Sequence, residues 1–444
     1  MIRIVVMLFA LLVAGPVLAL DLLDIYREAQ ANDSRYAAAR AQFQSQQERL
    51  PQARAGLLPD INFDAAYNYT DVDVDYLDAI TFDSGRRDYN AYNYGLSLIQ
   101  PLYRRQNKLA LDQAVVQVAQ AATDLDLAGQ DLILRAAQAY FDVLLARFNL
   151  RAERAQQTAV GEQLEQAKRN FVVGTATITD QREAQARYDL TSARVIAADN
   201  DLRVATQALE LLTGRPVTEE LAGLRAGVEF RPPAPKSIEA WVEQSYATNL
   251  EVLRAQQALD IARTEVQRQR AGHQPTLDLV GSISEAYQGS SNFGVGSETT
   301  SGIIGVELNL PLYQGGAVNS RTREAIGQQD RATQELESAR RSVGQATREA
   351  YLGVTLGIAQ VGAFEQAVAS TELQLESTKL GQEVGVRTAV DVLNAQSQLT
   401  LARRDLAQAV YNTLLSQLRL QAAVGRLVEA DLLNINELLD TQAQ

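Results

Sequence analysis

The same sequence features occur twice in this chain at one constant spacing. The spacing is 211 positions, as between the glycines at 174 and 385 (385 minus 174). A single offset that relates several residue types over a long stretch indicates a tandem duplication, which limits the fold to two copies of one unit. The pairs that keep the spacing are Gly174 and Gly385, Asp180 and Asp391, Gly214 and Gly425, and Tyr140 and Tyr351.

Each copy contains a helical pattern far longer than ordinary domains use. No proline occurs from 102 to 170, and small or apolar residues recur there three and four positions apart, as in a coiled-coil seam. At about 1.5 Å per residue this run reaches roughly 100 Å. A second run covers about 316–380. We interpret the interruptions at Gly174 and Gly385 as reversals into antiparallel return helices.

The apolar period changes from about 3.6 to 2 ahead of each long helical run. These alternating segments have about the 9–11 residues that a tilted membrane strand needs. The residues alone fit an ordinary amphipathic hairpin on a water-soluble core equally well. The predicted hairpins, 60–100 and 276–311, contain the alternating segments 61–69, 89–99, 277–287 and 303–310.

Four strands are too few to close a barrel by themselves. An open sheet edge in lipid leaves backbone groups without hydrogen bonds, at a cost of several kcal/mol each. Small closed barrels begin at about eight strands. If these segments cross a membrane, several copies of the chain must therefore share one barrel.

Composition argues against two classes of function. The formal charge of −13 provides no basic face for nucleic acid. The chain has no cysteine, one histidine and no glycine-rich phosphate loop, so the usual nucleophiles and metal ligands are missing. We therefore expect no enzymatic activity, no cofactor and no metal site.

The start of the chain is typical of a secretory signal. A basic residue precedes the apolar run 4–14, and Val17-Leu18-Ala19 provides the small residues of a cleavage site. A membrane anchor would need about 20 apolar residues, and Gly15-Pro16 interrupt this run. The predicted divisions are a signal peptide 1–19, a first repeat 20–213, a linker 214–236, a second repeat 237–426 and a C-terminal tail 427–444.

Together these features resemble the TolC family of outer-membrane export channels. The resemblance covers 21 to about 439 and rests on the signal peptide, the doubled proline-bounded hairpins, the Pro-Leu-Tyr segments at 101–103 and 311–313, and the two Val-Gly tips. It implies a mainly α fold with membrane β structure. In such a fold a long antiparallel α-helical barrel continues into a trimeric transmembrane β-barrel, to which each protomer gives four strands.

The resemblance also implies a function. It is that of the outer-membrane exit duct of a tripartite efflux or type I secretion system, which passively conducts substrates and is gated at the periplasmic tips. The implied partners are two further copies, a periplasmic adaptor protein, an inner-membrane pump of the ABC or RND type and outer-membrane lipid. The implied location is the outer membrane of a Gram-negative bacterium, extending into the periplasm. The alternative, a periplasmic coiled-coil scaffold without a pore, explains the helices but not the paired hairpins.

By resemblance, polar links between the two tips close the periplasmic entrance, and the small tip residues receive the adaptor. The chain departs from the family at Asn394, where the family has a second aspartate, and at Gln382, where it has a tyrosine. From the residues alone, the glycines and aspartates also fit plain helix ends. The implied gate residues are Thr179, Asp180, Arg387, Asp391 and Asn394, and the implied docking residues are Gly174, Thr175, Ala176 and Gly385.

Overall fold

The computed structural model describes residues 19–77, 81, 84–225, 227–291 and 295–440. The predicted signal peptide lies outside these residues except for Ala19. The chain forms two compact units, each of which is described by itself. The first unit comprises Met1–Arg40, Leu125–Val252 and Ala339–Gln444, and the second comprises Ala41–Asp124 and Leu253–Ser338.

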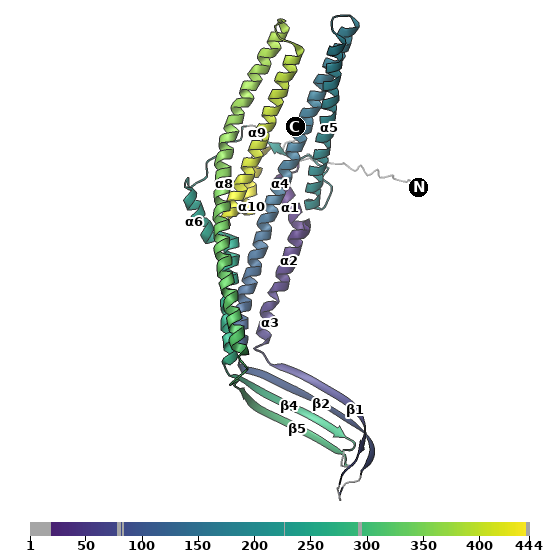
Figure 1. Ribbon diagram of the computed structural model, residues 1–444, viewed down its shortest axis with the longest axis vertical. Coiled ribbons are helices and arrows are strands. Elements are labelled where there is room, and N and C mark those ends of the chain that lie inside the picture. The colour runs from purple at the N-terminus through teal and green to yellow at the C-terminus, as the bar shows by residue number, and fades with distance from the viewer. Residues whose placement is uncertain (1–18, 78–80, 82–83, 226, 292–294, 441–444) are drawn as a thin grey trace, which may run out of the picture. The chain divides into compact units, whose positions relative to one another are not determined.

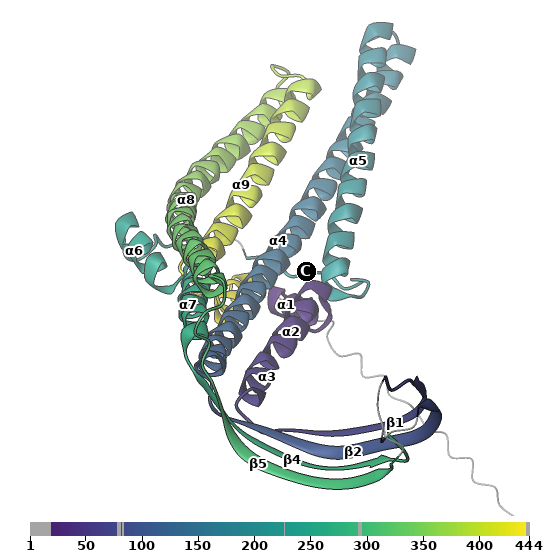
Figure 2. The same ribbon diagram turned by 60° about the horizontal axis from the view of Figure 1, so that its bottom comes forward.

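The second unit contains a four-stranded antiparallel sheet (Figures 1 and 2). Its strands follow the order β1-β2-β4-β5, so β1 and β5 are the two edges. The strands are β1 (Asp60–Val74), β2 (Gly85–Tyr103), β4 (Thr276–Gln288) and β5 (Ser297–Asn309).

The register of the sheet gathers the apolar side chains on one face. Phe63 lies opposite Leu96, and Leu96 lies opposite Ile283. Because successive residues of a strand point to opposite faces, the polar residues between them share the other face. The apolar face is open to solvent in the single chain, with Phe63 66% and Ile304 83% exposed.

Helices enter and leave the sheet at one end. The helices α2 (Ser34–Gln47) and α3 (Arg49–Ala55) lead to β1, and α7 (Leu250–Arg270) with a 3-10 turn leads to β4. Arg104 begins the exit from β2 and forms a two-point ion pair with Asp278 of β4, at 2.7 and 2.8 Å. The Asp278 side chain is 11% exposed. This two-point ion pair links the end of β2 to the start of β4.

The first unit consists of long helices around one core. Tyr140 is fully buried, and its hydroxyl donates to the carbonyl oxygens of Leu20 and Ala222. The linker and the chain end meet in this unit, where β3 (Gly223–Leu224) pairs with β6 (Leu439–Asp440). The helices that lie in this unit are α1 (Leu22–Asn32), α5 (Ile178–Thr213), α6 (Ile238–Thr248), α9 (Ala389–Ala423) and α10 (Glu429–Asn436). The long helices α4 (Arg105–Val172) and α8 (Ala317–Glu383) contribute their tip-side parts, from Leu125 and Ala339, and their remaining turns belong to the second unit.

An ion pair fixes the break between α1 and α2. Asp33 is 5% exposed, its carboxylate accepts from the backbone N–H of Tyr36, and Arg135 of α4 donates to both of its oxygens. The Arg135 guanidinium lowers the pKa of the Asp33 carboxyl. A buried carboxylate needs such a partner, because burial otherwise disfavours its charged form.

One described helix, α8, includes an 18-residue window of mean hydropathy 1.2. The window is long and apolar enough to cross a membrane, but one such helix does not by itself indicate a membrane span. Only 17% of the window is buried in the chain. Most of this apolar window is therefore left uncovered by the residues that the structure describes.

Candidate functional site

The first tip joins α4 to α5 through a left-handed glycine. Gly174 has φ +79°, and the next two backbone N–H groups donate to the carbonyl of Asn170. Thr177 then caps α5, accepting from the Asp180 N–H at 3.2 Å. The Asp180 carboxylate in turn accepts from the Thr177 N–H at 2.7 Å and from its hydroxyl at 2.8 Å. This is a reciprocal capping box that satisfies the first donors of the helix.

The second tip joins α8 to α9 in the same way. Gly385 has φ +80°, and the N–H groups of Val386 and Arg387 donate to the carbonyl of Gly381. Thr388 caps α9 and accepts from the Asp391 N–H at 3.2 Å. The Asp391 carboxylate accepts from the Thr388 N–H at 2.8 Å and its hydroxyl at 2.9 Å.

These hydrogen bonds control the charge of both tip carboxylates. The Thr177 backbone N–H, and then its hydroxyl, hold the pKa of Asp180 below its usual value. Thr388 lowers the pKa of Asp391 in the same order, and the nearby positive charge of Arg387 lowers it further. Both groups therefore carry negative charge at neutral pH at the positive end of a helix dipole.

The other predicted gate residues are exposed at the tips. Thr179 and Asn394 make no side-chain hydrogen bond in the described part of the chain, and Arg387 makes no ion pair there. Arg387 instead lies over Gly381, where an added Cβ would come within 2.8 Å of its Cγ. Within one chain, the residue that Arg387 influences electrostatically is Asp391.

The predicted docking residues lie among exposed apolar side chains that the sequence analysis did not single out. Gly174 and Gly385 have open space where a Cβ would be. Val172 and Val173 flank the first glycine, 83% and 70% exposed. At the second tip Val384 and Val386 are 68% and 76% exposed. Each tip therefore presents a small apolar patch, a common feature of protein-binding sites.

The capping threonines were also missed by the sequence analysis. Thr177 and Thr388 stand three residues before the aspartates, the spacing of a capping box. That spacing was available in the sequence and indicates a structural role for each aspartate in addition to any role in a gate.

Comparisons with known proteins agree with this architecture. The sequence profile of the outer membrane efflux protein family matches residues 25–215 and 241–426. The outer membrane protein TolC of Vibrio cholerae is 36% identical over 429 residues, 95% of this chain and 94% of that protein. The alkaline protease secretion protein AprF of Pseudomonas aeruginosa is 32% identical, over 96% of this chain and 88% of its own length.

A solved structure shows the same fold. The CmeC outer membrane channel of Campylobacter jejuni aligns with a TM-score of 0.80, over 94% of this chain and 88% of that chain, at 16% identity. The family match and the relatives, together with the shared fold, identify an outer-membrane channel protein rather than an enzyme. The chain belongs to the outer membrane efflux protein family. It is an exit duct that lies in the outer membrane and extends into the periplasm.

Loss of a capping threonine should loosen its tip. Thr388→Ala removes the acceptor for the Asp391 N–H, and such losses typically cost about 1 kcal/mol. We expect amide exchange in the first turn of α9 to accelerate about fivefold, while Thr388→Ser retains the slow rate. Hydrogen exchange with mass spectrometry measures both variants. Equal amide exchange rates in the wild type and Thr388→Ala would contradict the assignment of Thr388 as the cap of α9.

The tips should also respond to acid. The folded-state pKa of Asp391 is lowered, so its stabilising contribution is complete above the unfolded value of about 3.9 and is lost as pH falls through the folded pKa. Protection factors in the first turn of α9, corrected for intrinsic exchange, should therefore fall on acidification. Asp391→Asn should give a flat profile over the same range, and a flat wild-type profile would contradict the linkage.

Proposed function

We propose that three copies of the chain form one twelve-stranded β-barrel and one α-helical barrel, with a gate at the tips that partner proteins open. The observation that carries this proposal concerns contacts between the first and second halves of the chain. For the strand pairing, the helix packing and the groove described below, the surface at the equivalent positions is exposed in the single chain. A ring of copies would close each of them. A pore-free scaffold leaves them unexplained.

The sheet gives the first open pair. The edges β1 and β5 carry unpaired backbone groups, and such groups are not tolerated in lipid. Because β1 and β5 run in opposite directions, β5 of one copy can pair with β1 of the next in the antiparallel sense found within the sheet. Three copies of four strands then give a closed barrel.

The helices provide a second pair of exposed surfaces, on α8 and α5. Within the chain α4 packs against α9, where the rings of Phe141 and Tyr411 stack at 5.2 Å. Phe141 is 1% and Leu415 3% exposed, and both belong to the same core. The residues 211 positions away from Phe141 and Leu415 are Leu352 and Val204, and both are exposed instead. Leu352 of α8 is 56% exposed and Val204 of α5 is 57% exposed.

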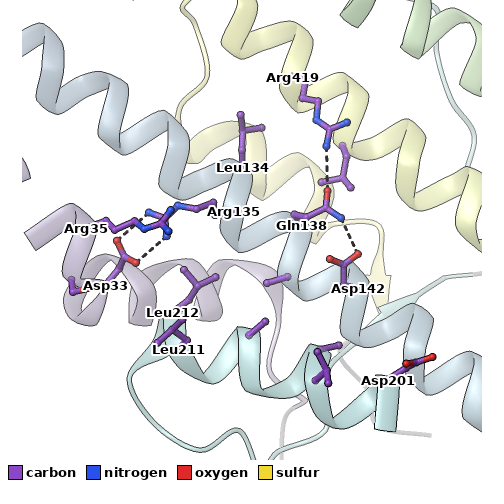
Figure 3. A pocket seen from close by; sticks show the side chains of 16 residues that line it. Asp33, Arg35, Leu134, Arg135, Gln138, Asp142, Asp201, Leu211, Leu212 and Arg419 are labelled. Carbon is purple, nitrogen blue, oxygen red and sulfur yellow. Dashed lines mark hydrogen bonds and ion pairs between the residues drawn. The ribbon is translucent and has the colours of Figure 1, made fainter. Parts of the chain in front are cut away.

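A groove beside α5 also has a counterpart in the other half of the chain at the spacing of 211 positions (Figure 3). It has a volume of about 760 Å³ and is lined by Asp142, Ala205 and Leu211, among others. Its counterpart 211 positions on includes Gly353, Ser416 and Ala422. The α4 residues Leu127, Ala128 and Asp131 also line that counterpart.

The equivalent positions on α8 are Ser338, Ala339 and Ser342. We propose that this segment of a neighbouring copy covers the groove in Figure 3. The contact is head-to-tail, since α8 of one copy meets α5 of the next, and such contacts generate rings.

This proposal includes the duplication and its bounds, 20–213 and 237–426, with 214–236 as a linker between them and 427–444 as the C-terminal segment. Matching local structures support it. Gly214 and Gly425 have φ +72° and +70°, and the two tips carry the same capping box. The C-terminal segment is packed, since Leu432 of α10 and Leu439 of β6 are fully buried.

The gate would form where the tips of three copies meet. Arg387 has no ion-pair partner in the described part of its own chain, so its guanidinium is available to Asp180 or Thr179 of another tip. Asp391 would supply a ring of carboxylates that favours cations, and the neutral Asn394 would leave the ring one turn further uncharged.

The tips would receive a periplasmic adaptor, which couples the duct to an inner-membrane pump of the ABC or RND type. The exposed valines beside Gly174 and Gly385 support this docking site. The likeness to AprF, a protein named for secretion of alkaline protease, supports protein export as one use of the duct.

The α5–α8 contact can be tested in a background free of cysteine. Asn200 and Leu352 are the counterparts of the stacked pair Tyr411 and Phe141. Asn200→Cys combined with Leu352→Cys should crosslink under oxidation into dimers and trimers, and no larger species, on non-reducing gels. As controls, each single variant should remain monomeric. So should Asn200→Cys with Leu373→Cys, because Leu373 lies roughly 30 Å further along α8. A double variant that remains monomeric would refute this contact.

The gate assignment predicts a change in conductance. Arg387→Ala removes the cation proposed to link the tips and should raise single-channel conductance in planar bilayers several-fold. Asp180→Asn, which retains an acceptor for the Thr177 cap, should act in the same direction. The matched control is Lys379→Ala, an exposed cation on α8 below the tip. Wild-type conductance in both gate variants would count against the assignment.

A further inference from the structure

The charge of the chain reverses where the strands meet the helices. The whole chain is acidic, with 54 acidic and 41 basic residues. The flanks of the strands at this end, 48–60, 104–112, 265–275 and 311–324, contain five acids, Glu48, Asp60, Asp112, Glu265 and Glu324, against nine basic residues. Their basic residues are Arg49, Arg54, Arg104, Arg105, Lys108, Arg268, Arg270, Arg321 and Arg323.

Two of these cations are neutralised within the chain. Arg104 pairs with Asp278, and Arg268 pairs with Glu265. The others have no ion pair among the described residues and are exposed, except Arg105, which is half-buried. We refer to six of them as the junction cations: Arg54, Arg105, Lys108, Arg270, Arg321 and Arg323.

The other end of the same sheet is acidic. The described part of the β1–β2 loop and its flanks contains Asp71, Asp73, Asp75 and Asp88 against Arg86 and Arg87. Arg86 is held by Asp71 through two hydrogen bonds. The concentration of unpaired positive charge is therefore specific to the helix end of the strands.

Exposed aromatic and apolar side chains lie at the same level as the junction cations. Tyr103 closes β2, 47% exposed, after Leu102, 52% exposed. After β5, Leu312 and Tyr313 are 89% and 88% exposed. Tyrosines in this position are typical of the boundary between the hydrocarbon core and the headgroups of a bilayer. The junction cations lie close to the same strand ends along the chain, at the headgroup level. Arg105 and Lys108 follow Tyr103 by two and five positions, Arg321 and Arg323 follow Tyr313 by eight and ten, and Arg54 and Arg270 each stand six positions before β1 and β4.

We propose that the junction cations bind the phosphates of anionic phospholipids in the periplasmic leaflet of the outer membrane. The helices leave the sheet at this end, so this is the periplasmic end of a duct that extends into the periplasm. Basic side chains near an anionic lipid surface are attracted to it, and their contributions accumulate. A trimer multiplies the junction cations threefold, and long arginine and lysine side chains reach headgroups while their stems cover apolar surface. The inference rests on the membrane location and would add lipid selectivity to the proposed function.

The test uses full-length protein reconstituted in bilayers with equimolar phosphatidylglycerol and phosphatidylethanolamine. The protein is then extracted in detergent, and native mass spectrometry counts the phospholipids that it retains. The wild type should retain phosphatidylglycerol about fivefold over phosphatidylethanolamine, which corresponds to about 1 kcal/mol per bound lipid. The preference should decline at high ionic strength, because salt screens exposed charges.

A variant with Arg54→Gln, Lys108→Gln, Arg321→Gln and Arg323→Gln should lose the preference. A matched control with Arg169→Gln, Arg182→Gln, Arg194→Gln and Lys379→Gln removes the same charge from exposed cations of the first unit and should retain the preference. Equal retention of both lipids by the wild type, or equal loss in both variants, would overturn the inference. Trimer formation and conductance are measured on the same samples. A conducting trimer without lipid preference refutes only the lipid site, whereas failure to insert in either lipid refutes the proposed duct.

Discussion

The unpaired edges of β1 and β5 are the constraint on which the rest of this structure depends. In water an edge strand can bond to solvent, but the hydrocarbon core of a membrane provides no partner for its N–H and C=O groups. A sheet with one apolar face and two open edges is therefore incomplete as a single chain. In the proposed assembly, the copies that complete the sheet also bring their helices together, and the exposed faces of α5 and α8 are the surfaces that those helices present.

The tip geometry limits how a gate can open. The Asp180 and Asp391 carboxylates each accept two hydrogen bonds from their capping threonine, so a swing to a new partner breaks both bonds, although the threonine hydroxyl can still cap the helix through the aspartate N–H. Opening by movement of whole helical hairpins preserves these bonds, and opening by side-chain rearrangement breaks them. In the proposed gate, Arg387 lies outside the capping box and is therefore the side chain that can change partners if the hairpins move.

The sequence predicted elements where a local pattern determines them. The alternation at 61–69 lies within β1, the proline-free run at 102–170 nearly coincides with α4, and Gly174 and Gly385 mark the reversals. Contacts between residues that are distant in the sequence could not be predicted from local patterns. The break between α1 and α2 depends on Arg135, about one hundred residues away from Asp33, and the packing of α10 and β6 depends on contacts with distant core residues. Of the candidate site, sequence located the tips but not the chemical environment of their carboxylates.

The differences between the two halves follow from when each interface forms. On the proposed duplication, the α4–α9 contact forms as the chain folds and is never exposed afterwards, so it can use Phe141 and Tyr411. In the proposed ring, the equivalent α8–α5 contact forms only when copies meet, and each copy must remain soluble in water before that. Its counterparts are Leu352 and the polar Asn200, a less apolar pair. Such a surface is exposed to water before assembly and buried after it. It favours smaller apolar residues interspersed with polar ones, because large exposed apolar patches promote aggregation.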